Sequence, residues 1–473
     1  MIPTTVREAA RRFGDTPAYV DEGGHEVGYA DLDRRSDEVA AGLAQSVGGG
    51  DVVALALGPS IDYVVAYVAV AKVGGITAGI NDRLAPAERA ALLERARPAL
   101  VIEHGEEVAA LARVGETPPP LPDDLDRPVA IVFTSGTTGT PNGALYTNRQ
   151  LAFITTTDVG DRWGGGAAGI AGTAFAHLGF MTKLPGNLRR GGTTFILRRW
   201  RAEDALALVE AHRIGVVSGV PTQLALMLRS PAFDRYDYSQ VHGLVVGGAP
   251  ITPDLAAEAR ERFDAPLATR YSCTEAGLGL GTGFDDPAED AIVSVGRPLP
   301  GVDLAVLDDT DVAVRPGNVG SVCLRSPAVM REYWGDSART NEAFTGEGFV
   351  RTGDLGYVDE AGRLRLVGRS KEMYVRGGYN VYPVEVEAAL AAHPGVAAVA
   401  IVPRADAVMG EIGVAVVVAR DPDAPPDLES LRGFAADRVA GFKLPEALAL
   451  MDDLPLTPSD KVDRRALAQR VAP

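Results

Sequence analysis

The stretch AIVFTSGTTGTPNG, residues 130–143, carries the strongest local signal in the sequence. An apolar run, Val129–Phe133, leads directly into glycines and hydroxyl side chains, which is the pattern of a strand that ends at an anion-binding turn. The Walker A pattern is absent, and a flexible surface turn is the alternative interpretation. The candidate nucleotide-binding residues of this loop are Thr134, Ser135, Gly136, Thr137, Thr138 and Gly139.

Around this loop, segments of helical period alternate with short β-branched runs. We predict helices over Ile61–Val73 and Pro86–Ala96, and strands over Gly75–Ile80 and Ala99–Glu103. This alternation predicts mainly parallel sheets covered by helices. The Pro- and Asp-rich stretch Gly115–Arg127 predicts a surface linker.

The pattern changes after a predicted strand at Arg363–Val367. The segments Lys371–Val375, Val384–Ala392, Val396–Val402 and Gly413–Val418 then form a compact α+β pattern of about a hundred residues, enough for a small domain. We therefore predict an α/β chain with a large N-terminal domain, residues 1–369, of parallel-rich sheets covered by helices. A small α+β C-terminal domain, residues 370–473, follows it.

Composition narrows the class of protein. The 473 residues are 46% hydrophobic and 23% charged, as in globular proteins, and the formal net charge of −17 argues against a nucleic-acid surface. Only two cysteines occur, Cys273 and Cys323, so we expect no disulfide framework and a cytoplasmic setting. The most apolar stretch, Tyr63–Ile80, is interrupted by Lys72, so we expect a buried helix and strand and no membrane span.

Further blocks have residue types that suit a nucleotide. In YSCTEA, residues 271–276, the ring of Tyr271 can stack on adenine, Thr274 can hold a phosphate and Glu275 can hold Mg²⁺. A Thr-Glu pair after a strand is otherwise usually a helix cap. Asp354, in RTGD, can accept ribose hydroxyls. Gly248 and Ala249 lie in the turn after strand 243–246, whose sequence GGAP resembles a loop that borders adenine and the acyl group in adenylate-forming enzymes; an ordinary strand-to-helix turn is the alternative.

In their order, these blocks resemble the adenylate-forming superfamily, which includes acyl-CoA synthetases, 4-coumarate–CoA ligases, luciferases and peptide-synthetase adenylation domains. The family's phosphate loop reads TSGTTGxPKG, and Asn142 stands here at its lysine. The family's C-terminal PxTxxGKxxR matches residues 455–464, where Lys461 is retained and Asp460 replaces glycine.

The resemblance implies ATP, Mg²⁺ and coenzyme A, and a mobile C-terminal domain. It makes Lys461 catalytic for adenylation, with Thr274 and Glu275, and His177 a gate for the acid. Arg369 would hold the ribose and Lys371 would be the hinge. The implied coenzyme A site is Arg376, Gly377 and Gly378.

The residues of the acyl pocket that the resemblance implies indicate the chemical class of the acid substrate. Residues 175–178 offer no aspartate to hold an α-amine, and the lining candidates are small or apolar, which favours a medium-chain, aromatic or alicyclic acid. A carrier-protein thiol as acceptor, or a degenerate binding protein without turnover, are the alternatives, and a homodimer is possible. The pocket candidates are Phe180, Thr182, Gly248, Ser272, Gly277 and Leu278.

Overall fold

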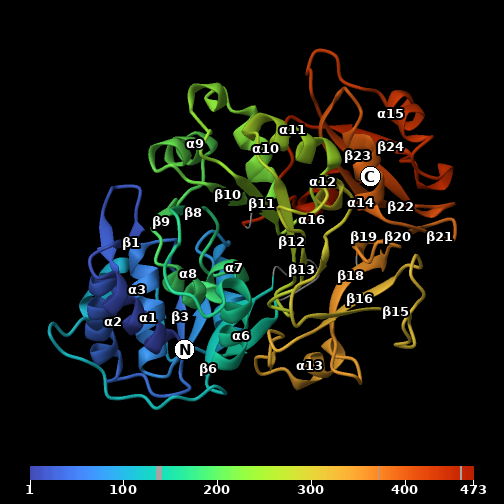
Figure 1. The fold of residues 1–473 in the computed structure, drawn as a ribbon. Helices are drawn as coiled ribbons and strands as arrows, with labels where there is room; N and C mark the ends of the chain where they lie inside the picture. Colours follow the sequence, from blue (N-terminus) through green and yellow to red (C-terminus); the bar gives the residue numbers. More distant parts are fainter. Residues whose placement is uncertain (135–140, 371, 459–460, 473) are drawn as a thin grey trace.

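A six-stranded sheet carries the strand before the Gly-rich loop (Figure 1). The computed structural model describes residues 1–134, 141–370, 372–458 and 461–472. Helices α3 (Ile61–Lys72) and α4 (Pro86–Ala96) connect the parallel strands, as predicted. In order, the strands are β17 (Glu332–Tyr333), β7 (Gly143–Thr147), β6 (Pro128–Phe133), β4 (Ile76–Gly79), β3 (Val52–Leu55) and β5 (Leu100–Ile102), and β7 and β17 run antiparallel.

A second sheet supplies the strand ends that face the site. Its first three strands are parallel, and α10 (Pro221–Arg229) and α11 (Pro253–Phe263) connect them. The strands are β10 (Val216–Gly219), β11 (Gly243–Gly247), β12 (Leu267–Tyr271), β13 (Leu280–Gly281) and β14 (Arg297–Pro298), the last two antiparallel. A smaller sheet holds β2 (Glu26–Gly28), β1 (Pro17–Val20), β9 (Thr194–Ile196) and β8 (Gly169–Ala171).

Helices cover these sheets and bury the most apolar stretch of the chain. Tyr63 to Val70 of α3 are fully buried, and β4 follows, so this stretch is a core helix and strand, as predicted. Within the described residues, no helix has the length and apolar character to cross a bilayer. Helices near the site are α6 (Asn148–Val159), α7 (Leu178–Met181) and α8 (Leu184–Arg190).

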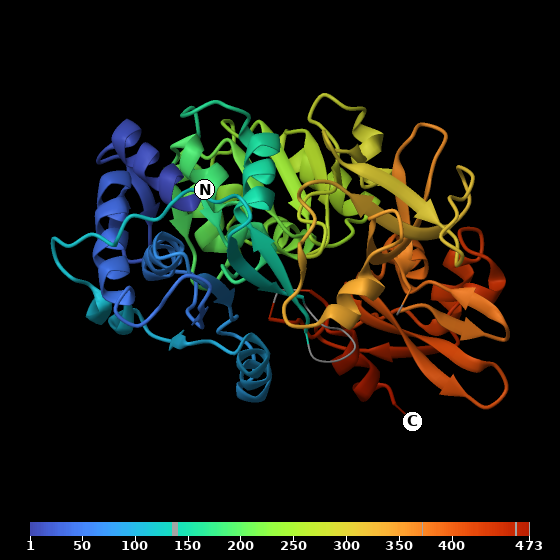
Figure 2. The ribbon, with the colours of Figure 1, turned by 90° about the horizontal axis from the view of Figure 1, so that it is seen from below.

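A fourth sheet is entirely antiparallel, which the prediction of mainly parallel sheets did not anticipate. Each strand pairs antiparallel with the next in the sheet, although the second and third are separated along the chain by a segment that contains β17 of the six-stranded sheet. It lies beside the final segment (Figure 2). Its strands are β15 (Asp303–Leu307), β16 (Gly320–Arg325), β18 (Val350–Val358) and β19 (Leu364–Arg369).

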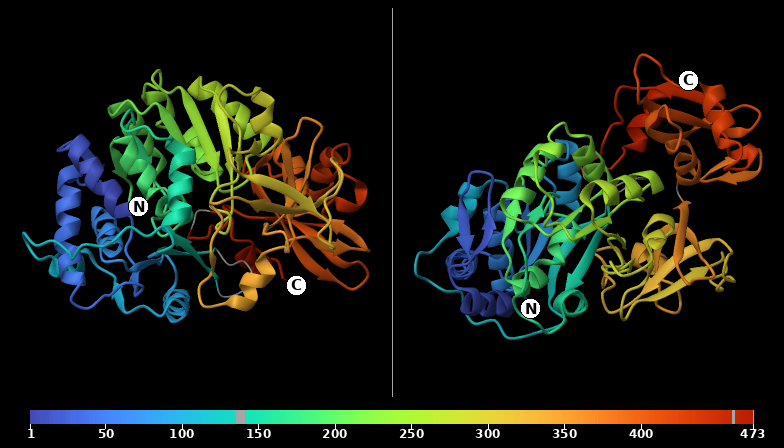
Figure 3. Two further views of the ribbon diagram at one scale, coloured as in Figure 1. Left: turned by 60° about the horizontal axis from the view of Figure 1, so that its bottom comes forward. Right: turned by 45° about the horizontal axis from the view of Figure 1, so that its top comes forward.

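The final segment forms a compact body at one end of the molecule, drawn orange to red in Figure 3. Two buried clusters fill it, and both draw only on residues 374–471. The predicted α+β character is confirmed. Its strands are β20 (Tyr374–Arg376), β21 (Tyr379–Val381), β22 (Val396–Asp406), β23 (Gly410–Ala419) and β24 (Ala447–Leu450), and its helices α14 (Pro383–Ala391), α15 (Leu428–Ala435) and α16 (Arg464–Arg470).

Candidate functional site

A large cleft, of about 2130 Å³, lies where the parallel strands of the second sheet end. Residues that follow β10, β11 and β12 line it, which is where open α/β sheets bind ligands. The final segment closes one side with Thr457, Pro458 and Lys461. The cleft therefore has walls from both parts of the chain.

An ion pair stands at one wall of the cleft. The pairing of β18 with β19 sets Asp354 opposite Arg369, and the Arg369 Nε atom lies 2.8 Å from an Asp354 carboxylate oxygen. The Tyr271 hydroxyl donates to the other oxygen, at 2.6 Å. Burial raises the pKa of Tyr271 well above its usual value, so the hydroxyl stays a donor. Burial alone would lower the pKa of Arg369, but the facing Asp354 carboxylate outweighs it and raises it.

The Thr274–Glu275 pair is held by two tyrosines. The Tyr333 hydroxyl of β17 donates to the Glu275 carboxylate at 2.6 Å, and the Tyr146 hydroxyl of β7 donates to the Thr274 carbonyl at 2.5 Å. Burial, followed by the charge of Glu275, raises the pKa of Tyr333, which keeps this donor protonated. Neither tyrosine was predicted from the sequence. Each lies within or beside an apolar run, and its hydroxyl is the only sign of a polar role.

The two ends of the Gly-rich loop meet at Thr134 and Asn142. The backbone N–H of Thr134 donates to the Asn142 carbonyl at 2.9 Å, and the Asn142 N–H donates to the Thr134 hydroxyl at 3.1 Å. The Asn142 side chain interacts with the Tyr333 hydroxyl, which in turn holds Glu275. Asn142 therefore connects the loop to the carboxylate. The predicted binding residues Ser135, Gly136, Thr137, Thr138 and Gly139 lie outside the described residues.

His177 stands on the cleft wall at the start of α7. Its Nε2 atom lies 3.1 Å from the Asn81 Nδ2 atom, and Asn81 also donates to the Pro458 carbonyl at 3.5 Å. A second hydrogen bond to the final segment joins the Arg229 guanidinium to the Ala397 carbonyl at 2.7 Å. His177 is thus linked through Asn81 to the segment that carries Lys461.

Lys461 is brought to the Asp354–Arg369 pair. A short bridge between Leu456 and Val462 closes its loop, in which the Lys461 N–H donates to the Thr457 hydroxyl at 3.2 Å. Burial lowers the pKa of Lys461 and the Arg369 charge lowers it further, against the effect of Asp354. Lys461 therefore lines the same cleft as the pair, and both charges of the pair act on its ammonium. Asp460 and the predicted hinge Lys371 lie outside the described residues.

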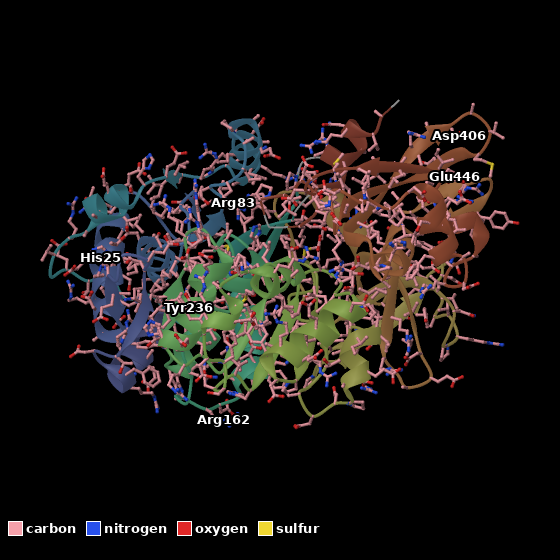
Figure 4. All side chains as sticks on the ribbon, turned by 90° about the horizontal axis from the view of Figure 1, so that it is seen from above. His25, Arg83, Arg162, Tyr236, Asp406 and Glu446 are labelled. Carbon is pink, nitrogen blue, oxygen red and sulfur yellow. The ribbon has the colours of Figure 1, made fainter. Side chains whose placement is uncertain are left out.

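The predicted coenzyme A residues lie elsewhere on the final segment. Arg376 pairs with Glu446, and Gly377 and Gly378 have φ of 54° and 86° in the turn between β20 and β21. None of the three is among the described residues that line the cleft. Figure 4 places Glu446 at the outer end of the molecule, near Asp406. The structure thus brings Lys461 to the cleft and leaves this hairpin away from it.

The predicted acyl pocket is largely on the cleft wall, with one exception. Thr182 is fully buried, and its hydroxyl donates to the Leu178 carbonyl at 2.8 Å, so it turns into its own helix instead. Gly277 has φ of 70°, and a Cβ there would lie 2.4 Å from the Ala328 carbonyl oxygen, so this glycine meets a backbone requirement and opens no space. On the cleft wall are Phe180, Gly248, Ala249, Ser272, Gly277 and Leu278.

The metal-ligating side chains of the cleft fit a metal ion that binds together with a nucleotide. Glu275 places a carboxylate in the cleft, but the described residues contain no group of three or more histidine, cysteine, aspartate or glutamate side chains that could hold an ion alone. Mg²⁺ is usually bound by one or two carboxylates plus phosphate oxygens and water. Both cysteines are free.

Comparison with known proteins defines the class. A family model described as AMP-binding enzyme matches residues 6–334, and a model of the AMP-binding enzyme C-terminal domain matches residues 385–461. The chain therefore belongs to the AMP-binding enzymes of the adenylate-forming superfamily, as the resemblance implied. It is an AMP-forming acid–thiol ligase.

Relatives of this chain act on several acids. It is 32% identical to the fatty acid–[acyl-carrier-protein] ligase ScoC of Streptomyces coeruleorubidus, over 96% of this chain and 93% of that one. It is 33% identical to a feruloyl-CoA synthase of an Amycolatopsis species, over 95% of each.

Solved structures match over nearly the whole chain. ATP-bound MatB of Rhodopseudomonas palustris superposes with a TM-score of 0.88 at 27% identity, covering 99% of both chains. The o-succinylbenzoate coenzyme A synthetase of Bacillus subtilis, bound to ATP and a magnesium ion, gives 0.83 at 25% identity, covering 98% of both.

Proposed function

We propose that the chain is an acyl-CoA ligase, which converts a carboxylic acid with an apolar body into an acyl-adenylate and then into a coenzyme A thioester. The position of Lys461 carries the proposal. This lysine, from the last segment of the chain, stands beside the Asp354–Arg369 pair in a cleft that Glu275 and His177 also line.

In the first half-reaction, the acid carboxylate attacks the α-phosphate of ATP and pyrophosphate leaves. Lys461 bridges the carboxylate and the α-phosphate, so its charge offsets the negative charge that gathers there. Thr274 donates to the phosphate, and Asp354 with Arg369 holds the ribose. These groups position the reactants within one cleft, which is the largest part of what such an enzyme contributes.

Glu275 is the residue that would hold Mg²⁺ against the phosphates, and the ion would spread their negative charge. Tyr333, which donates to Glu275 at 2.6 Å, fixes the direction of the carboxylate. The described residues of the loop, Thr134 and Asn142, stand beside this pair. A carboxylate whose direction is fixed by a hydrogen bond is suited to act as a pre-organised metal ligand.

The second half-reaction needs another arrangement. We propose domains of residues 1–369 and 370–473, with Lys371 as the hinge, and a rotation that withdraws Lys461 and brings Arg376, Gly377 and Gly378 to the adenylate. The coenzyme A thiol then attacks the acyl carbon and AMP leaves. Separate buried clusters on the two sides of the boundary support this division.

The acceptor and the setting are also proposals. Coenzyme A is favoured by the feruloyl-CoA synthase relatives, and a carrier-protein thiol by the 32% identity to ScoC. A cytoplasmic setting agrees with two free cysteines, and a homodimer remains a prediction.

A panel of acids tests the function. Each acid is incubated with the protein, ATP and Mg²⁺, with and without coenzyme A, and AMP, pyrophosphate and free thiol are measured. We expect pyrophosphate exchange with at least one acid, and AMP with loss of one thiol per AMP when coenzyme A is added. Adenylation without thiol loss, restored by a carrier protein, would favour the carrier-protein alternative. No nucleotide turnover with any acid would overturn the proposal.

A further inference from the structure

One face of the helices beyond His177 lines the cleft and is polar from Lys183 onward. Gly179, Lys183, Asn187 and Arg190 recur at intervals of three or four residues, and all four line the cleft. Thr182 and Lys183, between α7 and α8, keep right-handed helical backbone angles, so the face continues across the junction. Residues at this spacing share one side of a helix.

Positive charge exceeds negative charge at this end of the cleft. Asp158, near the end of α6, lies 2.8 Å from the Lys183 ammonium and 3.9 Å from the Arg190 guanidinium. Asp158 is thus shared between two cations. All three side chains keep some exposure, at 24% for Asp158, 27% for Lys183 and 44% for Arg190, so a ligand in the cleft can reach them.

A third cation faces them from the second sheet. Arg270, at the end of β12, lines the same cleft, and its guanidinium donates to the carbonyls of Thr269 and Thr282. No ion pair of Arg270 occurs among the described residues, although the charges of Asp158 and Asp286 act on it at longer range. Asp286 does not line the cleft and accepts from the Gly283 N–H.

We propose that this end of the cleft, formed by Lys183, Arg190 and Arg270 around Asp158, binds an oxygen acceptor at the far end of the acid. The inference rests on the proposed function, since it takes the cleft to be the acyl site. The acid therefore has an apolar body and a distal carboxylate or carbonyl. An apolar tail against these cations would displace their water without supplying a hydrogen-bond acceptor, which disfavours an acid with a purely apolar far end.

The spacing sets the size of the acid. Lys183 follows His177 by six residues, which is about 9 Å along a helix at 1.5 Å per residue. The intervening wall is made of Gly179 and Phe180, so the body of the acid meets apolar and open surface before it reaches the cations. A medium-chain acid bridges this interval.

Matched acids test the proposal. We would compare octanoate, 7-oxo-octanoate and octanedioate, in kcat/KM for thioester formation and in equilibrium binding measured by calorimetry. The wild-type protein should prefer one or both oxygen-bearing acids over octanoate by about tenfold or more, the range expected for a hydrogen bond to a charged group. The two oxygen-bearing acids separate an ionic from a neutral acceptor.

Variants locate the preference. Lys183→Met should lower the ratio of oxygen-bearing acid to octanoate by about tenfold, and Lys183→Met with Asp158→Asn should do the same without leaving Asp158 unpaired. Arg189→Met is the control: Arg189 neighbours Arg190 but lies over the Trp163 ring and donates to the Gly160 carbonyl, away from the cleft wall. Its ratio should match the wild type.

Two results would overturn the proposal: a wild-type protein that binds octanoate as well as both oxygen-bearing acids, or a preference that survives in both Lys183 variants. Failure of the proposed function looks different. There, no acid would yield thioester, whereas the calorimetric preference and its loss in the Lys183 variants would still support the acceptor site.

Discussion

At the scale of single residues, Glu275 is defined by the hydroxyl that holds it. Tyr333 donates to the carboxylate, and the Met330 N–H holds the Glu275 carbonyl at 2.8 Å, so the side chain has one fixed direction. Glu275→Gln should lower pyrophosphate exchange by about two to three orders of magnitude, as the loss of one charged transition-state contact does.

Glu332→Gln is the matched control for that change. Glu332 precedes Tyr333 on β17 but is not among the residues that line the cleft. Both variants should keep the wild-type unfolding temperature. Exchange by Glu275→Gln at the level of Glu332→Gln would show that Glu275 has no part in adenylation.

The glycines of the cleft differ in what they allow. Gly277 has positive φ and a carbonyl oxygen 2.4 Å from the position of a Cβ, so Gly277→Ala should lower the unfolding temperature and reduce activity on all acids alike.

A Cβ at Gly179 meets nothing within 4 Å, and this residue lines the cleft. Gly179→Phe should leave stability near wild type and reject long acids more than acetate. Equal rejection of every acid by Gly179→Phe would remove Gly179 from the acyl channel.

At the scale of elements, the hairpin of β20 and β21 is the proposed coenzyme A face. Gly378→Leu should keep pyrophosphate exchange and lose thioester formation, because the side chain would obstruct the pantetheine arm. The φ of 86° also strains any side chain, so Gly378→Asn, which tolerates this region better, separates strain from bulk. If Gly378→Asn and Gly378→Leu lose thioester formation equally, bulk is not the cause.

The elements also show what the sequence could and could not predict. Helix α4 begins and ends at the predicted residues, because its amphipathic period and its Pro86 start are local signals. The antiparallel sheet of β15, β16, β18 and β19 was predicted only in its last strand, since its pairing depends on contacts between segments that are distant in the sequence. The family motifs predicted that Asp354, Glu275 and Lys461 lie at one site. Tyr333 was missed because its role depends on a partner 58 positions away.

At the scale of the whole molecule, one body carries both Lys461 and the hairpin. Lys461→Ala should lower adenylation by about two to four orders of magnitude, since it removes the charge that bridges carboxylate and phosphate. Supplied with synthetic acyl-AMP and coenzyme A, the same variant should form thioester at close to the wild-type rate. Equal damage to both half-reactions would contradict a mechanism in which the body uses two faces in turn.

The docked body also sets a pH dependence. Burial, and then the charge of Arg369, lower the pKa of Lys461, so its proton is lost at lower pH than that of an exposed lysine. Adenylation needs the charged form, so kcat/KM for ATP should fall as pH rises, with a midpoint below the ordinary lysine value. In Lys461→Arg the fall in kcat/KM should move to higher pH, and thioester formation from acyl-AMP should show no such fall. If both half-reactions fell with the same midpoint, the group that titrates would be one other than Lys461.

Two hydrogen bonds between the described parts of the body and the rest, Asn81 to Pro458 and Arg229 to Ala397, both end on backbone carbonyls. A hydrogen bond of this kind contributes about 1 kcal/mol net. A hydrogen bond of this strength can break and re-form at little cost in free energy if the body rotates as proposed. Because both acceptors are carbonyl oxygens, substitutions at Pro458 and Ala397 that preserve the backbone path keep these hydrogen bonds, whereas changes at Asn81 and Arg229 remove them. At these two contacts, tolerance of substitution therefore lies on the side of the final segment.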